Sequence, residues 1–270
     1  MAIVNRTPDS FYDKGATFED AAALEAVDRA VTDGADIVDI GGVKAGPGAT
    51  VDTGEEIRRV VPFVRAVRSR HPGLVISVDT WRADVAAACL AEGADVINDA
   101  WGGVDEGIAA ATAAGDGALV CTHAGHVEPR TRPHRIGYDD VVRDVLDTTV
   151  GLAERAVAAG VARESVLIDP GHDFGKNTWH SLEVTRRLPE LVASGWPVLV
   201  SLSNKDFVGE TLDRPVPERL TGTLATTALC AWMGARVFRA HNVRETRETL
   251  DMIASIRGER PPAVTRRGLA

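Results

Sequence analysis

Eight short apolar runs alternate with longer helical stretches along this sequence, and that alternation limits the folds open to it. The runs are continuously apolar, which is typical of parallel strands covered on both faces. The predicted strands are Ala2–Asn5, Ile37–Ile40, Val75–Asp79, Val96–Asn98, Ala118–Cys121, Val166–Asp169, Val198–Ser201 and Val237–Arg239. Helices are predicted between them at Phe18–Thr32, Glu55–Arg70, Arg82–Glu92, Asp139–Ala159, Thr178–Leu191 and Pro217–Met233.

Eight such units without a break in composition predict one domain over residues 1–270, folded as an α/β (β/α)8 TIM barrel. A doubly wound sheet is the alternative, because periodicity does not show whether a sheet closes. A length of 270 residues suits a single barrel.

Charge and cysteine content narrow the possible partners. A net charge of −9 argues against a nucleic-acid or anionic membrane surface. Cys89, Cys121 and Cys230 are scattered and odd in number, which favours a reducing compartment over a disulfide scaffold. Since the sequence has no apolar run long enough for a membrane span, we expect a cytoplasmic protein.

Polar side chains stand where the predicted strands end. They are Asn5, Asp79, Asn98 and Asp169, then Ser203 and Lys205 after the seventh strand, and Arg239 and His241 at the eighth. In a barrel these converge on one mouth. Carboxylates and an amide suit a flat heterocycle rich in N–H donors, because a carboxylate accepts two parallel, charge-assisted hydrogen bonds. Arg239 and His241 are suitable donors for a phosphate.

Each of these residues also has a simpler explanation. Asp169, before Pro170 and Gly171, can cap the next helix. Lys205 can be a solvated loop lysine, and Arg239 can pair with an acid at the barrel rim. The convergence of separate strand ends is what favours a site.

Two long loops follow strands, at Asn5–Ala16 and Thr122–Tyr138. The first is expected to close over the mouth and exclude water. The second contains His123 and His126, which have the spacing of a metal pair but no third ligand, so a surface loop is predicted there.

Six ordered motifs resemble those of the dihydropteroate synthase family. They are Asn5-Arg6-Thr7-Pro8-Asp9-Ser10-Phe11, Ser77-Val78-Asp79-Thr80, Ile97-Asn98-Asp99, Asp169-Pro170-Gly171 with Phe174-Gly175-Lys176, Ser203-Asn204-Lys205, and Arg239-Ala240-His241. The resemblance covers nearly the whole chain. It implies a (β/α)8 barrel, usually dimeric, that joins a pterin diphosphate to 4-aminobenzoate and releases pyrophosphate.

The resemblance also implies roles for the strand-end residues. Asp79, Asn98, Asp169 and Lys205 would bind the pterin, and Asp79, Asp169 and Lys205 would serve the chemistry. Asn5 with Mg²⁺, together with Arg239 and His241, would hold the diphosphate. Sulfonamide or sulfone analogues would compete for the aminobenzoate position.

The chain departs from the family on the side of the second substrate. Where the family has Glu-Ser-Thr-Arg, this sequence has Val43-Lys44-Ala45-Gly46, inside an unchanged frame of Gly41-Gly42 and Pro47-Gly48. The family's Ser-Arg-Lys is Ser203-Asn204-Lys205, followed by Asp206, and His172-Asp173 replaces an apolar-glycine pair. This pattern is similar to the second synthase-like paralogues of actinobacteria.

The sequence therefore predicts a pterin-binding barrel whose synthase activity is weak or lost. Three alternatives stay open: a fully active synthase, a non-enzymatic pterin-binding or regulatory protein, and a pterin-dependent methyltransferase on a related barrel. The methyltransferase lacks support, because the sequence has no corrinoid-binding partner domain.

Overall fold

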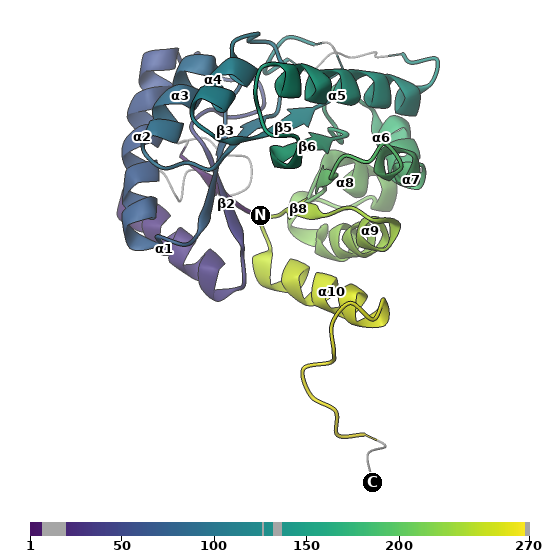
Figure 1. The fold of residues 1–270 in the computed structure, drawn as a ribbon. Coiled ribbons are helices and arrows are strands. Elements are labelled where there is room, and N and C mark those ends of the chain that lie inside the picture. The colour runs from purple at the N-terminus through teal and green to yellow at the C-terminus, as the bar shows by residue number, and fades with distance from the viewer. Residues whose placement is uncertain (7–19, 126, 132–136, 268–270) are drawn as a thin grey trace.

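A computed structural model describes residues 1–6, 20–125, 127–131 and 137–267 of the chain. Its strands are β1 (Ala2–Asn5), β2 (Ile37–Gly41), β3 (Val75–Asp79), β4 (Val96–Asp99), β5 (Ala118–Thr122), β6 (Val166–Asp169), β7 (Leu199–Ser201) and β8 (Val237–Arg239). Its α-helices are α1 (Asp20–Thr32), α2 (Thr53–Arg70), α3 (Ala83–Ala91), α4 (Ile108–Ala114), α5 (Val141–Ala158), α6 (Thr178–Arg186), α7 (Leu188–Val192), α8 (Asp206–Leu212), α9 (Leu220–Met233) and α10 (Val243–Ile256). The helices lie outside the strands, and the segment after α10 extends away from the barrel (Figure 1).

The parallel strands close into a barrel. β1 to β6 form one sheet in chain order, and β7 pairs with β8. Single bridges join the two groups, between Ile168 and Val198 and between Ala2 and Ala240. The Ala240 amide also donates to Met1 O at 2.9 Å. The prediction of a TIM barrel is confirmed, and the doubly wound sheet is wrong.

The barrel interior changes from apolar to polar along each strand. Neighbouring strand residues point to opposite faces, so Leu167 and Asp169 face the interior together, as do Val237 and Arg239. Near the N-terminal ends an apolar layer forms from Val96, Val120 and Leu199 with Met1, Val75, Ala118, Leu167 and Val237. One end of the barrel is thus packed, and polar groups remain at the other.

A larger core lies between the strands and the helices. Outward-facing isoleucines at the centres of four strands, namely Ile40, Ile76, Ile97 and Ile168, are completely buried. The core holds the strand ends in fixed register, which positions the polar residues that follow them.

One predicted helix is wrong. The stretch Thr178–Leu191 forms two helices, α6 and α7, that meet at Arg187. Pro189 lies in the first turn of α7, where its missing N–H costs nothing, whereas inside a continuous helix it would break a backbone hydrogen bond.

The loop Asn5–Ala16 falls almost entirely outside the described residues, as do His126 and part of the Thr122–Tyr138 loop. Within the described ranges, no helix is both long and apolar enough to cross a membrane.

Candidate functional site

A cavity of about 590 Å³ opens at the polar, C-terminal mouth of the barrel. All seven site residues predicted from the sequence line it: Asn5, Asp79, Asn98, Asp169, Lys205, Arg239 and His241. Because they stand at the ends of strands that are far apart in sequence, barrel closure alone brings them together.

Asp39 does not line the cavity but is completely buried against two residues that do, and it is not among the predicted site residues. Its buried carboxylate accepts hydrogen bonds from Ser77 Oγ at 2.6 Å, Asn98 Nδ2 at 3.1 Å and Arg239 Nε at 2.5 Å. Arg239 Nη2 also donates to Asp79 Oδ2 at 3.0 Å. Asp39 therefore orients Asn98 and Arg239. One feature of the sequence could have identified Asp39: it is an acidic residue inside the otherwise apolar run that forms β2.

Arg239 thus forms the acid pairs that the sequence left open as an alternative. Two of its nitrogens bind carboxylates, and the residue still lines the cavity. His241, two residues on, donates its backbone N–H to Ser203 Oγ at 3.1 Å, and its Nδ1 lies 3.0 Å from the same oxygen. Both side chains reach the mouth because β8 ends at Arg239.

Asp169 and Lys205 form the opposite side of the cavity. Asp169 Oδ1 accepts the Gly171 N–H at 2.7 Å, so the predicted capping role is present, although it caps a turn. Its Oδ2 has no hydrogen bond to any described residue. Lys205 is partly buried: its Nζ donates to His172 O at 2.5 Å and lies 4.9 Å from the centre of the Phe174 ring.

Burial shifts the pKa values of these groups toward their neutral forms. Burial raises the pKa of Asp79 to about 7, against the opposing charge of Arg239. It also raises the pKa of Asp169, although Lys205 and the Gly171 N–H oppose the shift. Burial lowers the pKa of Lys205, against the charges of Asp173 and Asp169. Perturbed groups that face one cavity are typical of functional sites.

The prediction of a surface loop at His123 is wrong. His123 is completely buried, with Nε2 2.6 Å from Asp144 Oδ1 and Nδ1 2.5 Å from Lys176 Nζ. His123 comes directly after β5, so its side chain lies in the protein interior. The spacing between His123 and His126 does not show this burial.

Residues 43–46 form a cavity wall with little hydrogen-bonding capacity. Val43, Lys44, Ala45 and Gly46 all line the cavity. Arg130, from the loop after β5, fixes the frame by donating to Gly46 O at 3.2 Å and Ala49 O at 2.8 Å. The wall is held in place, but only Lys44 gives it a polar side chain.

Two further departures from the family pattern, His172 and Asp173, have different surroundings: His172 lies in the core and Asp173 lines the cavity. His172 is buried, stacks on the Phe207 ring at 5.4 Å and lies 3.0 Å from Thr185 Oγ1, so it serves packing. Asp173 lines the cavity with a left-handed φ of 66°. Its Oδ2 accepts the Phe207 N–H at 3.2 Å. Asp173 thereby adds a carboxylate beside Lys205.

Asn204 lies in the loop after β7, and Asp206 is the first residue of α8. Asn204 lines the cavity and donates to Asn242 Oδ1 at 3.3 Å. Asp206 accepts from Arg219 at 2.9 Å.

Oxygen atoms suited to Mg²⁺ are present at the ends of β1 and β3. A Cβ placed on Gly41 would lie 4.0 Å from both Asn5 Oδ1 and Asp79 Oδ2, so both oxygens flank the space left by this glycine. Mg²⁺ is typically held by one or two protein oxygens together with substrate phosphates. The residues fit that ion, although no group of three His, Cys, Asp or Glu among the described residues can hold a metal alone.

Residues 1–241 match the family described as "Pterin binding enzyme". The chain belongs to this family. The inactive dihydropteroate synthase 2 of Mycobacterium tuberculosis (strain H37Rv) is 61% identical over 274 residues, which cover 100% of this chain and 86% of the relative. The dihydropteroate synthase of Haemophilus influenzae is 38% identical, over 93% of this chain and 90% of the relative.

A solved family member has the same fold. The crystal structure of Yersinia pestis dihydropteroate synthase in a sulfonamide drug complex superposes with a TM-score of 0.91 at 36% identity, covering 96% of this chain and 94% of that chain. The predicted family is therefore confirmed, and the chain resembles both active and inactive members.

Proposed function

We propose that this chain is a dihydropteroate synthase homologue that binds a pterin or pterin diphosphate at the barrel mouth, with condensation weak or lost. One contrast carries the proposal. The polar residues at the strand ends line one cavity, whereas the wall at residues 43–46 has lost nearly all its polar groups. The 61% identity to an inactive synthase 2 supports the same conclusion.

Asp169, Asn98, Asp79 and Lys205 are the proposed pterin-binding residues. Asp169 would accept the N–H groups of the amino-pyrimidinone edge, because its Oδ2 is not used by the turn at Gly171. Asn98 is oriented by Asp39 and can present its amide oxygen to the ring. Lys205, whose ammonium is partly buried at the cavity, would donate to a ring oxygen or nitrogen.

Asn5, Arg239 and His241 are the proposed diphosphate-binding residues, with Asn5 as a Mg²⁺ ligand. Arg239 retains Nη1 for a phosphate oxygen while its other two nitrogens remain on Asp39 and Asp79. When bound, Mg²⁺ supplies positive charge to the departing pyrophosphate. Asp79 and Asp169 would stabilise the cationic pterin methylene in any residual chemistry, and Lys205 would hold the pterin ring in place for it.

Condensation also requires an arylamine held against the pterin methylene. Orientation of that kind contributes many kcal/mol to a rate. Val43, Ala45 and Gly46 offer no side-chain hydrogen bond, and Lys44 lacks the planar fork of the arginine it would replace. We therefore expect weak binding of 4-aminobenzoate, or of its sulfonamide and sulfone analogues, without productive alignment.

We further propose one domain over residues 1–270 that forms a homodimer in the cytoplasm. Buried, unpaired Cys89, Cys121 and Cys230 suit a reducing compartment.

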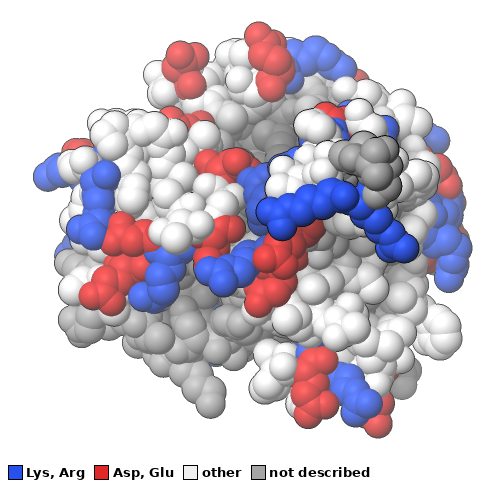
Figure 2. Space-filling view, turned by 90° about the horizontal axis from the view of Figure 1, so that it is seen from below, with Lys and Arg blue, Asp and Glu red and all other residues white. Residues whose placement is uncertain are grey.

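The proposed dimer surface consists of exposed Trp232 on α9 with Met252 and Ile256 on α10, which suit self-association. On the face that Figure 2 shows, acidic and basic side chains are interspersed, which gives no preference there for a polyanion.

Steady-state product formation from 6-hydroxymethyl-dihydropterin diphosphate and 4-aminobenzoate tests the proposal. We expect turnover at least about a hundredfold below that of an authentic synthase assayed in parallel, as loss of substrate orientation predicts. Comparable turnover would favour the fully active synthase instead.

A further inference from the structure

Lys176 places a buried ammonium group on the cavity wall, at the junction of two strand-end loops. Its Nζ lies 2.5 Å from His123 Nδ1, 3.0 Å from Phe174 O, 3.1 Å from Gly171 O and 3.3 Å from His123 O. Four acceptor atoms from the loops after β5 and β6 thus surround the three N–H groups of the Lys176 ammonium. The ammonium connects the two loops, and one of these loops begins at Asp169.

His123 connects this ammonium to the protein surface. While Lys176 is an ammonium, His123 Nδ1 can only accept from it, which places the ring proton on Nε2, 2.6 Å from Asp144 Oδ1. His123 is completely buried, whereas the Asp144 side chain is 35% exposed in the first turn of α5. Three titratable groups therefore run in sequence from solvent to the cavity wall.

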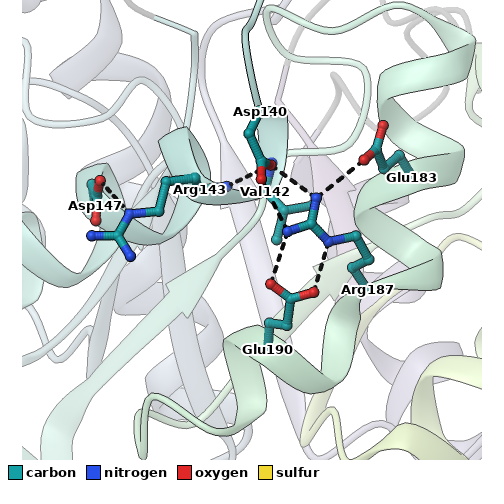
Figure 3. Close-up of polar contacts among 7 residues, drawn as sticks. All are labelled: Asp140, Val142, Arg143, Asp147, Glu183, Arg187 and Glu190. Carbon is teal, nitrogen blue, oxygen red and sulfur yellow. Dashed lines mark hydrogen bonds and ion pairs between the residues drawn. The ribbon is translucent and has the colours of Figure 1, made fainter.

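The turn that carries Asp144 is fixed by an ion-pair network around Arg187 (Figure 3). Asp140 caps α5 by accepting the N–H groups of Val142 at 2.9 Å and Arg143 at 3.0 Å. Arg187 binds both oxygens of Asp140, at 2.9 and 3.1 Å, and also binds Glu190 at 2.7 Å. These contacts tie the start of α5 to the junction of α6 and α7, which holds Asp144 opposite His123.

The use of lysine in this chain is selective. Only four of its 30 Lys and Arg residues are lysine, namely Lys14, Lys44, Lys176 and Lys205. Every lysine in the described ranges lines the cavity. Arginine keeps its charge at any physiological pH, whereas a buried lysine can lose its proton. The cavity thus contains lysines that can titrate, whereas the 26 arginines of the chain keep their charge.

The surroundings of Lys176 favour titration near neutrality. Burial lowers the pKa of Lys176 from 10.5 to about 7. The charges of Asp169, Asp144 and Asp173 oppose that shift, and Lys205 adds to it. Burial lowers the pKa values of neighbouring His172 and His180; the charges of Lys205 and Lys176 add to the shift at His172, and that of Lys176 adds to it at His180.

We propose that Lys176 is a pH-dependent positioning residue: as an ammonium held by His123 and Asp144, it keeps the β5 and β6 loops in the shape that binds an anionic pterin. This inference rests on the proposed pterin-binding function. When the ammonium loses its proton, the loop carbonyls lose a donor and the cavity loses a positive charge. Affinity for a pterin diphosphate therefore falls as pH rises.

Asp144→Asn with Asp147→Asn as its matched control tests the inference. Asp147 lies one turn further along α5, where it pairs with Arg143 at 2.9 Å and does not reach His123. Calorimetry would measure the affinity for 6-hydroxymethyl-dihydropterin diphosphate with Mg²⁺ from pH 6 to pH 9. We expect wild-type affinity to fall about fivefold or more across this range, and the fall to begin at lower pH in Asp144→Asn, because a lost anion lowers the pKa of a nearby lysine. Asp147→Asn should follow the wild type, and comparison at equal pH cancels titration of the ligand.

A direct titration provides the second readout. In protein labelled with ¹³C at lysine Cε, four resonances are expected, and the Lys176 signal is identified by its absence in Lys176→Arg. Its midpoint should lie near pH 7 in the wild type and lower in Asp144→Asn. A Lys176 midpoint above pH 9, or identical pH profiles for Asp144→Asn and the wild type, would overturn the inference while leaving pterin binding intact. Failure of the wild type to bind the pterin at every pH would overturn the proposed function and this inference with it.

Discussion

Asp169 illustrates how one side chain can have a structural and a binding role together. The sequence left two explanations open, a cap and a ligand. In the structure Oδ1 accepts the Gly171 N–H at 2.7 Å, which accounts for the cap, and Oδ2 is not used by the turn. The carboxylate lines the cavity beside Lys205. The two explanations are therefore compatible, one for each oxygen.

Asp169→Asn should separate these two roles. The amide oxygen can still accept the Gly171 N–H, but the charge and one acceptor for the pterin are lost. Losing a charge-assisted hydrogen bond costs about 1.5–3 kcal/mol, so pterin affinity should fall at least about tenfold. Calorimetry measures the affinity, and a melting curve near that of the wild type is the control. Unchanged affinity would mean that Asp169 only caps the turn.

Asp79 should make stability depend on pH in a defined direction. Its pKa is raised to about 7 in the folded protein, from 3.8, so the folded state holds the proton more tightly. The resulting stabilisation is complete below pH 3.8 and is lost as pH rises through about 7. Asn has no proton to lose, so the melting temperature of Asp79→Asn relative to the wild type should increase from pH 4 to pH 8. A difference that stays constant with pH would contradict this assignment.

At the scale of elements, strands were easier to predict than helices. β1, β3, β6 and β8 have the predicted bounds, because a continuous apolar run ends where a polar residue begins. The predicted helix Thr178–Leu191 is interrupted at Arg187 because of Pro189. The helical pattern of the sequence runs on through Pro189, so it did not predict the interruption. No helix was predicted at α4 or α8, which are too short for a clear helical period, or at α10.

The wall at residues 43–46 is the element that should limit activity. Replacing Val43-Lys44-Ala45-Gly46 by Glu-Ser-Thr-Arg, together with Asn204→Arg, should restore part of the dihydropteroate formation. The frame can accept the graft because Arg130 holds Gly46 O and Ala49 O through the backbone. Asn204→Arg alone is the control and should recover little. If the full graft binds the pterin but gains no turnover, the loss of activity lies elsewhere.

For the whole molecule, the sequence predicted which residues meet at the barrel mouth but not how they pair. All seven predicted residues line one cavity, because parallel strand ends in a closed barrel share a face. The pairing of Arg239 with Asp39 crosses 200 positions, and that of Lys176 with His123 crosses 53. Such contacts depend on side-chain conformations in the folded barrel, which local patterns do not specify.

The proposed homodimer should depend on the exposed apolar side chains of α9 and α10. Trp232 is 55% exposed and Met252 is 61% exposed. Trp232→Glu combined with Met252→Glu should convert the assembly to monomers of 28.7 kDa in light scattering. Trp179→Glu is the control, because Trp179 is 79% exposed but lies on α6. A wild-type protein that is already monomeric would contradict the proposed surface.

The central claim is that a functional pterin site persists where condensation is weak or lost, and titration with 6-hydroxymethyl-dihydropterin diphosphate alone tests it most directly. Calorimetry with Mg²⁺ present and no 4-aminobenzoate should show one binding site per chain. Because the cavity is lined by Asp79, Asn98, Asp169 and Lys205, we expect saturable binding without the second substrate. Absence of saturable binding to the folded protein would contradict the account.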